Sequence, residues 1–200
     1  ADSASAGIGS DGVTVDKTSV GADGTDVATF KALVKDANGN PVRDVDVTWS
    51  TTFGNLGGTT SKTDANGIAT VTLSSTALGA AQVQARLGSS AAVDAPVVTF
   101  IGSIATARIS ALTSSIAKIT ATGGESTTLT ATVTDAAGHA VPDATVDWST
   151  TAGDLAGATS NTGADGKATV TFTAVRTETT NGTATITAGI NSTTRDTNVT

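Results

Sequence analysis

Histidine and cysteine, which often carry nucleophilic catalysis, are nearly absent from this sequence. There is no cysteine, and His139 is the single histidine. A serine or threonine nucleophile needs a neighbouring base and an orienting acid. His139 stands beside Gly138 in a turn-forming stretch, which is typical of a solvated turn residue. We therefore predict no catalytic residue and no enzymatic activity.

Oxygen-bearing side chains that could bind a cation occur in short clusters: Asp36 with Asn38, Asp64 with Asn66, and Asp23 with Asp26. Calcium takes about six to eight oxygens, and an EF-hand loop ends in a bidentate glutamate. The only glutamates, Glu125 and Glu178, do not follow such a loop. We interpret the clusters as turn residues and predict no metal ligands and no cofactor. A calcium ion shared by aspartates of two domains at their seam stays open as an alternative.

Two covalent modifications also have candidate residues. A lysine isopeptide cross-link needs a buried lysine beside a carboxylate, but Lys31 and Lys35 fall on the outward side of a predicted strand. Asn181 and Asn191 each begin an Asn-X-Ser/Thr pattern. We interpret both patterns as chance matches and expect neither modification.

The composition favours a folded chain of β-strands. Hydrophobic residues make up 38% and charged residues 14%, which allows a core of modest size, while threonine, valine and alanine suit pleated strands. The net charge of -7 disfavours nucleic acid and anionic membranes as partners. No apolar run approaches the ~18 residues of a membrane span. We expect no direct membrane contact and a monomeric fragment.

An internal repeat decides the domain organisation. Residues 36–73 match residues 135–172 without a gap at the spacing set by Trp49 and Trp148, and about 22 of these 38 positions are identical. Further on, Gly79 corresponds to Gly182, so the second copy carries about four extra residues around Thr177 to Asn181, in a predicted surface loop.

A period near 100 residues suits one small sandwich domain. We predict two domains, residues 1–102 and 103–200, with a seam near Phe100 to Ile104. The chain reaches Thr200 before a full counterpart of the first copy's closing strand, so we expect the second domain to be cut at its C-terminal edge. No flexible spacer separates the copies, which predicts a short, stiff junction and an elongated rod.

Alternation of apolar and polar residues assigns the strand faces in both copies. The expected inward sets in the first copy include Phe30, Ala32 and Val34, then Val45, Val47 and Trp49, then Ala69, Val71 and Leu73, then Ala81, Val83 and Ala85. Their mates in the second copy alternate in the same way. Turn pairs such as Asn66-Gly67 stand between the strands. About seven strands per copy and one inward tryptophan predict an all-β fold: two tandem immunoglobulin-like antiparallel β-sandwiches.

The motifs of both copies resemble the bacterial Ig-like repeats of group 1, found in tandem in the intimin and invasin adhesins of Gram-negative bacteria. The matching residues are Asp36 to Val42, Val47-Thr48-Trp49-Ser50, Gly54-Asn55-Leu56 and Thr63 to Val71. The second copy departs from the pattern at Ala140, where the first has Pro41, and at Gly163, where the first has Asp64.

The resemblance implies a stalk segment of a surface adhesin, which projects a distal receptor-binding domain and is anchored to the outer membrane through a part not present here. Its partners would be neighbouring Ig-like domains of the same chain, with any host receptor bound by other domains. An adhesive module that binds a host protein or glycan through loops or a sheet edge is the alternative. A eukaryotic-type Ig receptor fragment is disfavoured by the absent cysteines.

Overall fold

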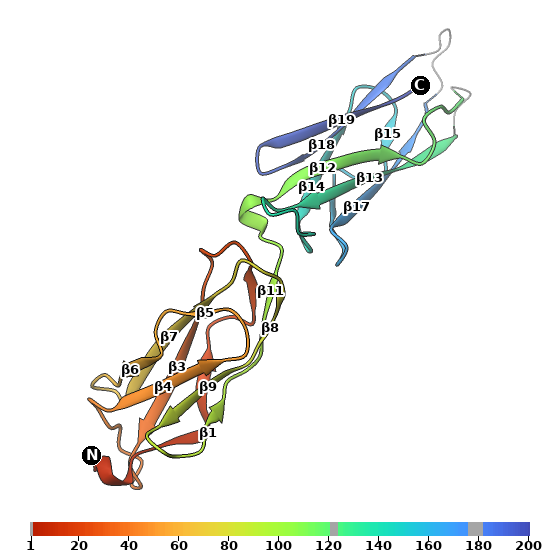
Figure 1. Ribbon diagram of the computed structural model, residues 1–200. Helices are drawn as coiled ribbons and strands as arrows, with labels where there is room; N and C mark the ends of the chain where they lie inside the picture. Colours follow the sequence, from red (N-terminus) through yellow and green to blue (C-terminus); the bar gives the residue numbers. More distant parts are fainter. Residues whose placement is uncertain (1, 121–123, 176–181) are drawn as a thin grey trace. The chain divides into compact units, whose positions relative to one another are not determined.

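The chain forms two compact units, Ala1–Ile101 and Gly102–Thr200, each built from strands. The computed structural model describes residues 2–120, 124–175 and 182–200. Within these ranges the only helical segments are two 3₁₀ turns, η1 (Ser3–Ser5) and η2 (Ile104–Thr106), one at the start of each unit. Figure 1 shows the strands of each unit arranged as facing sheets.

The first unit contains two four-stranded antiparallel sheets. One has the order β1, β3, β7, β5, and the other has the order β10, β9, β4, β6. A third, three-stranded sheet has the order β2, β11, β8. The strands are β1 (Gly7–Val15), β2 (Ser19–Gly21), β3 (Ala28–Lys35), β4 (Asp46–Thr51), β5 (Asn55–Leu56), β6 (Thr60–Lys62), β7 (Ile68–Ser74), β8 (Gly79–Ala81), β9 (Val83–Leu87), β10 (Val93–Asp94) and β11 (Val98–Ile101).

The second unit repeats this plan with two four-stranded sheets, ordered β12, β13, β17, β15 and β16, β14, β18, β19. Here one continuous strand stands where the first unit has β8 and β9, and another where it has β10 and β11. The strands are β12 (Arg108–Ser114), β13 (Ser126–Thr134), β14 (Thr145–Thr150), β15 (Asp154–Leu155), β16 (Thr159–Asn161), β17 (Lys167–Thr173), β18 (Ala184–Ile190) and β19 (Thr193–Val199).

Each unit has its own apolar core, formed by the faces that alternation predicts. In β3, Phe30, Ala32 and Val34 are fully buried, while Lys31 and Lys35 are exposed. Trp49 and Trp148 are 2% and 5% exposed, so both point inward as predicted. The prediction of an all-β, Ig-like fold is confirmed. Alternation was informative because a period of two in the sequence fixes which side of a pleated strand meets the core.

Backbone conformation explains the glycine at the end of the Asp36 turn. Gly39 has φ 82°, and its mate Gly138 has φ 89°. This left-handed region is costly for residues with a Cβ. In each unit the glycine N–H donates to the carbonyl of the aspartate three residues earlier, Asp36 or Asp135, which closes the turn.

One pairing departs from the expected antiparallel pattern. β11 pairs in parallel with β2, with Thr99 opposite Ser19 and Phe100 opposite Val20, while its other side pairs antiparallel with β8. The last strand of the first unit therefore lies between β8 and a short strand from near the unit's start. Two hydrogen bonds of the second unit resemble this pairing: the Thr200 N–H donates to the Ala117 carbonyl, and the Ile119 N–H donates to the Thr200 carbonyl.

Candidate functional site

The Asp36 carboxylate, a candidate ligand by residue type, is occupied by hydrogen bonds from its own turn. It accepts from the N–H groups of Asn38 and Asn40, at 3.0 and 2.9 Å, and from the Asn40 side chain. It also accepts from the Asp2 N–H at 3.1 Å. The Asn40 backbone and side-chain bonds, together with the Asp2 bond, lower the pKa of Asp36 to about 2. The carboxylate thus ties the start of the unit to the turn.

His139 lies in the equivalent turn of the second unit, where it replaces Asn40. Its Nδ1 is 3.1 Å from Oδ2 of Asp135, and its backbone N–H donates to Asp135 Oδ1 at 2.8 Å. Burial alone would raise the pKa of Asp135, but hydrogen bonds from His139 and from the Ser103 N–H lower it. With Asp135 almost fully buried, this pair links the turn to the start of the unit.

The other acidic candidates serve turns in the same way. Asp64 accepts from the N–H groups of Asn66 and Ile68, and Asp23 accepts from those of Thr25 and Asp26. Glu125 Oε2 accepts from the Thr120 N–H at 2.7 Å, just as Asp26 accepts from the Gly21 N–H in the first unit. In the part of the chain that the structure describes, no three His, Cys, Asp or Glu side chains form a metal-binding group.

The residues considered for covalent modification lie on β3, between β18 and β19, or outside the described residues. Lys31 and Lys35 have exposed side chains on β3. Asn191 lies between β18 and β19, and its side chain donates to the Ile104 carbonyl at 2.6 Å. Asn181 and Glu178 lie outside the described residues, as does the insertion predicted around Thr177 to Asn181.

The segment from Phe100 to Ser103 spans the boundary of the two units, and its residues are held within one unit or the other. Phe100 is 1% exposed in the first core, and the Ile101 carbonyl accepts from the Ala22 N–H at 2.7 Å. In the second unit the Ser103 N–H donates to Asp135 at 3.3 Å. A Cβ on Gly102 would lie 2.2 Å from the Ala140 carbonyl oxygen, so only glycine allows this close approach.

The exposed edge of the second unit carries features that discourage pairing with another chain. β19 is an edge strand with a polar, charged sequence. Arg195 Nη1 donates to the Ser110 carbonyl at 2.6 Å, which ties β19 to the irregular part of β12 at the edge of the other sheet. Charged side chains and bulges are common means of blocking strand addition.

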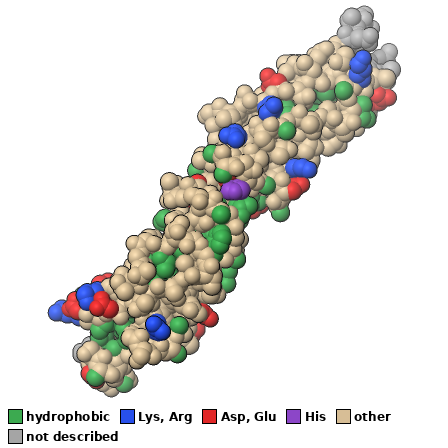
Figure 2. All heavy atoms as spheres, in the orientation of Figure 1, with side chains coloured by type: hydrophobic (Ala, Val, Ile, Leu, Met, Phe, Trp, Pro, Cys, Tyr) green, Lys and Arg blue, Asp and Glu red, His purple; other side chains and the backbone are tan. Residues whose placement is uncertain are grey.

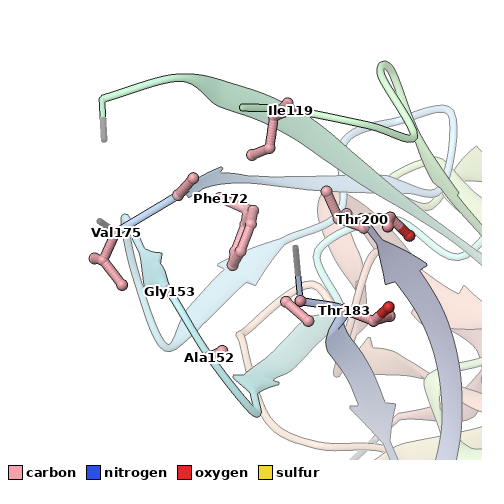
Figure 3. Close-up of a pocket in the computed structure, with 11 residues that line it drawn as sticks. Ile119, Ala152, Gly153, Phe172, Val175, Thr183 and Thr200 are labelled. Atoms are coloured by element: carbon pink, nitrogen blue, oxygen red, sulfur yellow. The ribbon is translucent and has the colours of Figure 1, made fainter. Parts of the chain in front are cut away.

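A cavity of about 120 Å³ opens at one end of the second unit. Figure 3 shows its wall, with the Phe172 ring among Ile119, Ala152, Gly153, Val175 and Thr200. The lining is mostly apolar, and no side chain among the described residues that form it is ionisable. The arrangement suits an apolar group.

The surface shows interspersed charges. Figure 2 shows acidic and basic side chains scattered over the visible face. Some form exposed ion pairs, such as Lys62 with Asp46 at 3.0 Å. Across the described residues, no helix has the length and apolar character needed to cross a membrane.

Comparison with protein families identifies the two units. Residues 11–101 and residues 109–200 each match the family described as bacterial Ig-like domain (group 1). The chain belongs to this family. The resemblance inferred from the sequence motifs is thereby confirmed.

Curated relatives of these Ig-like domains are adhesins. The chain is 36% identical over 170 residues to the inverse autotransporter adhesin YeeJ of Escherichia coli K12, covering 81% of the chain and 7% of that protein. It is 35% identical over 173 residues to intimin of E. coli O111:H-, covering 83% of the chain and 18% of intimin. The chain therefore spans less than a fifth of either relative.

Solved structures share the fold of these Ig-like units. The E. coli adhesin FdeC aligns with 97% of the chain and 66% of its own, at a TM-score of 0.63 and 22% identity. A C-terminal fragment of intimin, solved with the intimin-binding domain of its translocated receptor, aligns with 94% of the chain and 62% of its own, at a TM-score of 0.52 and 25% identity.

Sequence reasoning missed three features of these Ig-like units: the aspartate that holds the start of each unit, the Arg195 bond to Ser110, and the cavity.

Proposed function

We propose that this chain is a spacer segment of a bacterial surface adhesin, in which tandem Ig-like units set the distance between the cell and a distal binding domain. The observation that carries this proposal is the boundary segment. Phe100 and Ile101 belong to the sheet and core of the first unit, and Ser103 is bound to Asp135 of the second. Each residue of the boundary segment is thus held by one unit or the other, and a single peptide bond joins the two units. So short a connection is suited to resist bending.

The same proposal includes location and partners. The named relatives are adhesins, and the intimin fragment was solved with a receptor domain. We infer that this chain is displayed on the bacterial surface, anchored by another part of its protein, and that its direct partners are the neighbouring Ig-like units. A host receptor would then be bound elsewhere in the protein.

An adhesive role for this chain is the competing function. Its described surface offers a shallow depression of about 270 Å³ along β14 and β18, with Asp147 as its one carboxylate. The two tryptophans, the residues most enriched at binding hot spots, lie almost fully buried. This burial, together with the charged edge at β19, favours the spacer.

The spacer proposal is tested by the distance between two labels, one on each unit. Thr70 and Thr169 are equivalent, exposed positions on β7 and β17, and the chain contains no native cysteine. Spin labels on Thr70→Cys and Thr169→Cys are expected to give one narrow distance distribution by pulsed electron resonance. Inserting Gly-Ser-Gly-Ser between Ile101 and Gly102 should broaden it, because such linkers behave as flexible coils.

The insertion variant serves as the matched control, since it leaves both units intact. A native chain whose distribution is as broad as that of the insertion variant would contradict a stiff spacer. Binding of the native chain alone to host cells, lost on Asp147→Ala but not on Asp46→Ala, would instead favour the adhesive role.

A further inference from the structure

The two units differ at one equivalent place on an outward sheet face. In the first unit Arg86 of β9 stands opposite Thr48 of β4, and in the second unit Gly189 of β18 stands opposite Asp147 of β14. In both units the β4 or β14 member of this pair directly precedes the inward tryptophan, so Gly189 is the mate of Arg86 and Asp147 is the mate of Thr48. The second unit therefore lacks the arginine and has a carboxylate beside the place that it left.

The missing side chain leaves a depression of about 270 Å³ on the second unit. Gly189 lies between Asp147 of β14 and Thr194 of β19, which are its partners on the two sides. These three strands lie in one sheet (Figure 1). Because cross-strand side chains stand only about 5 Å apart, a glycine between two longer residues opens a hollow on the face. Ser149 and Thr187 add hydroxyl groups to its lining.

The depression has an acidic lining without a counter-charge. Asp147 is exposed, and within the described residues its carboxylate takes part in no hydrogen bond or ion pair. Asp196 adds a second negative charge in the neighbouring row, where it accepts from the Thr187 hydroxyl at 2.6 Å. Arg195, the only basic residue of β14, β18 and β19, donates to the Ser110 carbonyl of the other sheet. The depression thus favours a cation from outside.

An arginine side chain suits this lining better than a lysine does. A guanidinium presents five N–H donors in one plane and is more weakly hydrated than an ammonium group. It can donate to a carboxylate and to neighbouring hydroxyl oxygens at the same time. In the first unit the equivalent place is filled by such a side chain, Arg86.

Arg86 is itself available for a partner. It is exposed on β9, which lies between β10 and β4, and within the described residues its guanidinium has no ion pair or hydrogen bond. Other charges of this face are already engaged, because Lys62 pairs with Asp46 at 3.0 Å and the Gln84 amide donates to Asp94 at 2.8 Å. Arg86 is therefore the cation that this face offers to another molecule.

We propose that the depression beside Asp147 receives Arg86 from a second copy of the chain. The outward face of β4 and β9 in one copy then lies against the outward face of β14 and β18 in the other. Charge complementarity supports this occupant, since an unpaired guanidinium and an unpaired carboxylate stand at equivalent places on the two faces. Exposed ion pairs each contribute little, so dilute chains stay monomeric and the contact forms at high local concentration.

The proposal is independent of the spacer role. Distances between labels within one dilute chain report stiffness, whereas this contact joins two chains, so either proposal can fail without the other.

Two variants of the full 200-residue chain, mixed together, test the contact. Arg86→Gln keeps the depression and loses the guanidinium, while Asp147→Asn keeps Arg86 and loses the carboxylate. Neither variant can form the complete contact with itself, but the mixture can. In isotope-labelled Arg86→Gln chain, unlabelled Asp147→Asn chain should shift the amide resonances of Gly189 and Thr194 in a saturable way. The unlabelled double variant should shift them about fivefold less at the same concentration.

A matched control removes a different cation from the same face. Adding Lys62→Gln to the unlabelled Asp147→Asn chain should leave the shifts at Gly189 unchanged, because Lys62 is paired with Asp46. Raising the salt concentration to about 0.5 M should reduce the shifts, because salt screens exposed charges.

Three results would overturn the proposal. Absence of shifts at Gly189 in the mixture at millimolar concentration would show that the two faces do not meet. Equal shifts with Asp147→Asn and with the double variant would show that Arg86 is not the occupant. If N-acetyl-arginine amide shifts Gly189 in a saturable way and the Asp147→Asn chain does not, the depression takes a basic side chain of another protein.

Discussion

The two units place different side chains around two equivalent glycines, Gly54 and Gly153. In the first unit Phe53, Leu73 and Phe100 meet over Gly54. In the second, Ala152 and Phe172 stand at the places of Phe53 and Leu73, and the Phe172 ring lies against Gly153. The comparison teaches that the last strand of an Ig-like unit here is part of its core, so the residues nearest the boundary contribute to stability and not merely to connection.

Away from Gly54 and Gly153 the hydrogen bonds that hold the two units agree closely, so this difference concerns the side chains around these glycines. Trp49 Nε1 donates to Ser61 Oγ and Trp148 Nε1 donates to Ser160 Oγ, each at 2.8 Å. The aspartate turns that hold the start of each unit also match, apart from His139 in place of Asn40. Predictions can therefore be made for one unit with the other as an internal reference.

The largest effect is expected from removing the Phe100 ring, which is 1% exposed, from the first core. Phe100→Ala should lower the free energy of unfolding of the first unit by about 3–5 kcal/mol, because it removes a buried ring and leaves a cavity. The urea dependence of amide exchange in first-unit peptides measures this loss. Val97→Ala, three residues earlier and half exposed, is the control and should cost little.

A smaller, equal effect is expected where the units are alike. Ser61→Ala and Ser160→Ala each leave a tryptophan N–H without its partner, which should destabilise the corresponding unit by about 1 kcal/mol. The same exchange measurement assigns each loss to its unit. A large cost in one unit and none in the other would contradict the matching geometry of the two pairs.

Acid should weaken the first unit through Asp36. Its pKa in the folded protein, about 2, lies below its ordinary value of 3.8, so the unfolded chain binds the proton more readily. The stabilising contribution is complete above about pH 4 and is lost as the pH falls toward 2. Unfolding followed across this range should show a smaller decline in Asp36→Asn, whereas exposed Asp11→Asn should keep the native decline.

Calcium is expected to have the smallest effect. The carboxylates of Asp36, Asp64 and Asp23 already accept hydrogen bonds from backbone N–H groups. Adding millimolar calcium or a chelator should therefore leave the melting temperature of both units unchanged. A calcium-dependent rise, or a calcium-dependent narrowing of the label distances, would support a shared ion at the seam.

The sequence was sufficient to predict the strand faces and the inward tryptophans, because alternation and the repeat constrain the same residues twice. The Trp49 partner could have been predicted as well. Ser61 stands opposite Val47 in the β4 and β6 pair, so Trp49, two residues further on, shares its face.

Other features depend on how sheets meet, which alternation does not encode. The bond from Arg195 to Ser110 joins the edges of two sheets. The parallel pairing of β2 involves only Ser19–Gly21, too short to show a period.

The parallel pair of β2 and β11 also determines how the first unit would carry mechanical load. Once β1 has separated from β3, tension on the two ends of the unit pulls β2 toward its start and β11 toward its end, and in a parallel pair these are opposite directions along one axis. Their hydrogen bonds would then be loaded together in shear, whereas an antiparallel pair held at the same ends would open one bond at a time. We therefore expect the strand that ends in Phe100 and Ile101 to be the mechanical clamp of its unit.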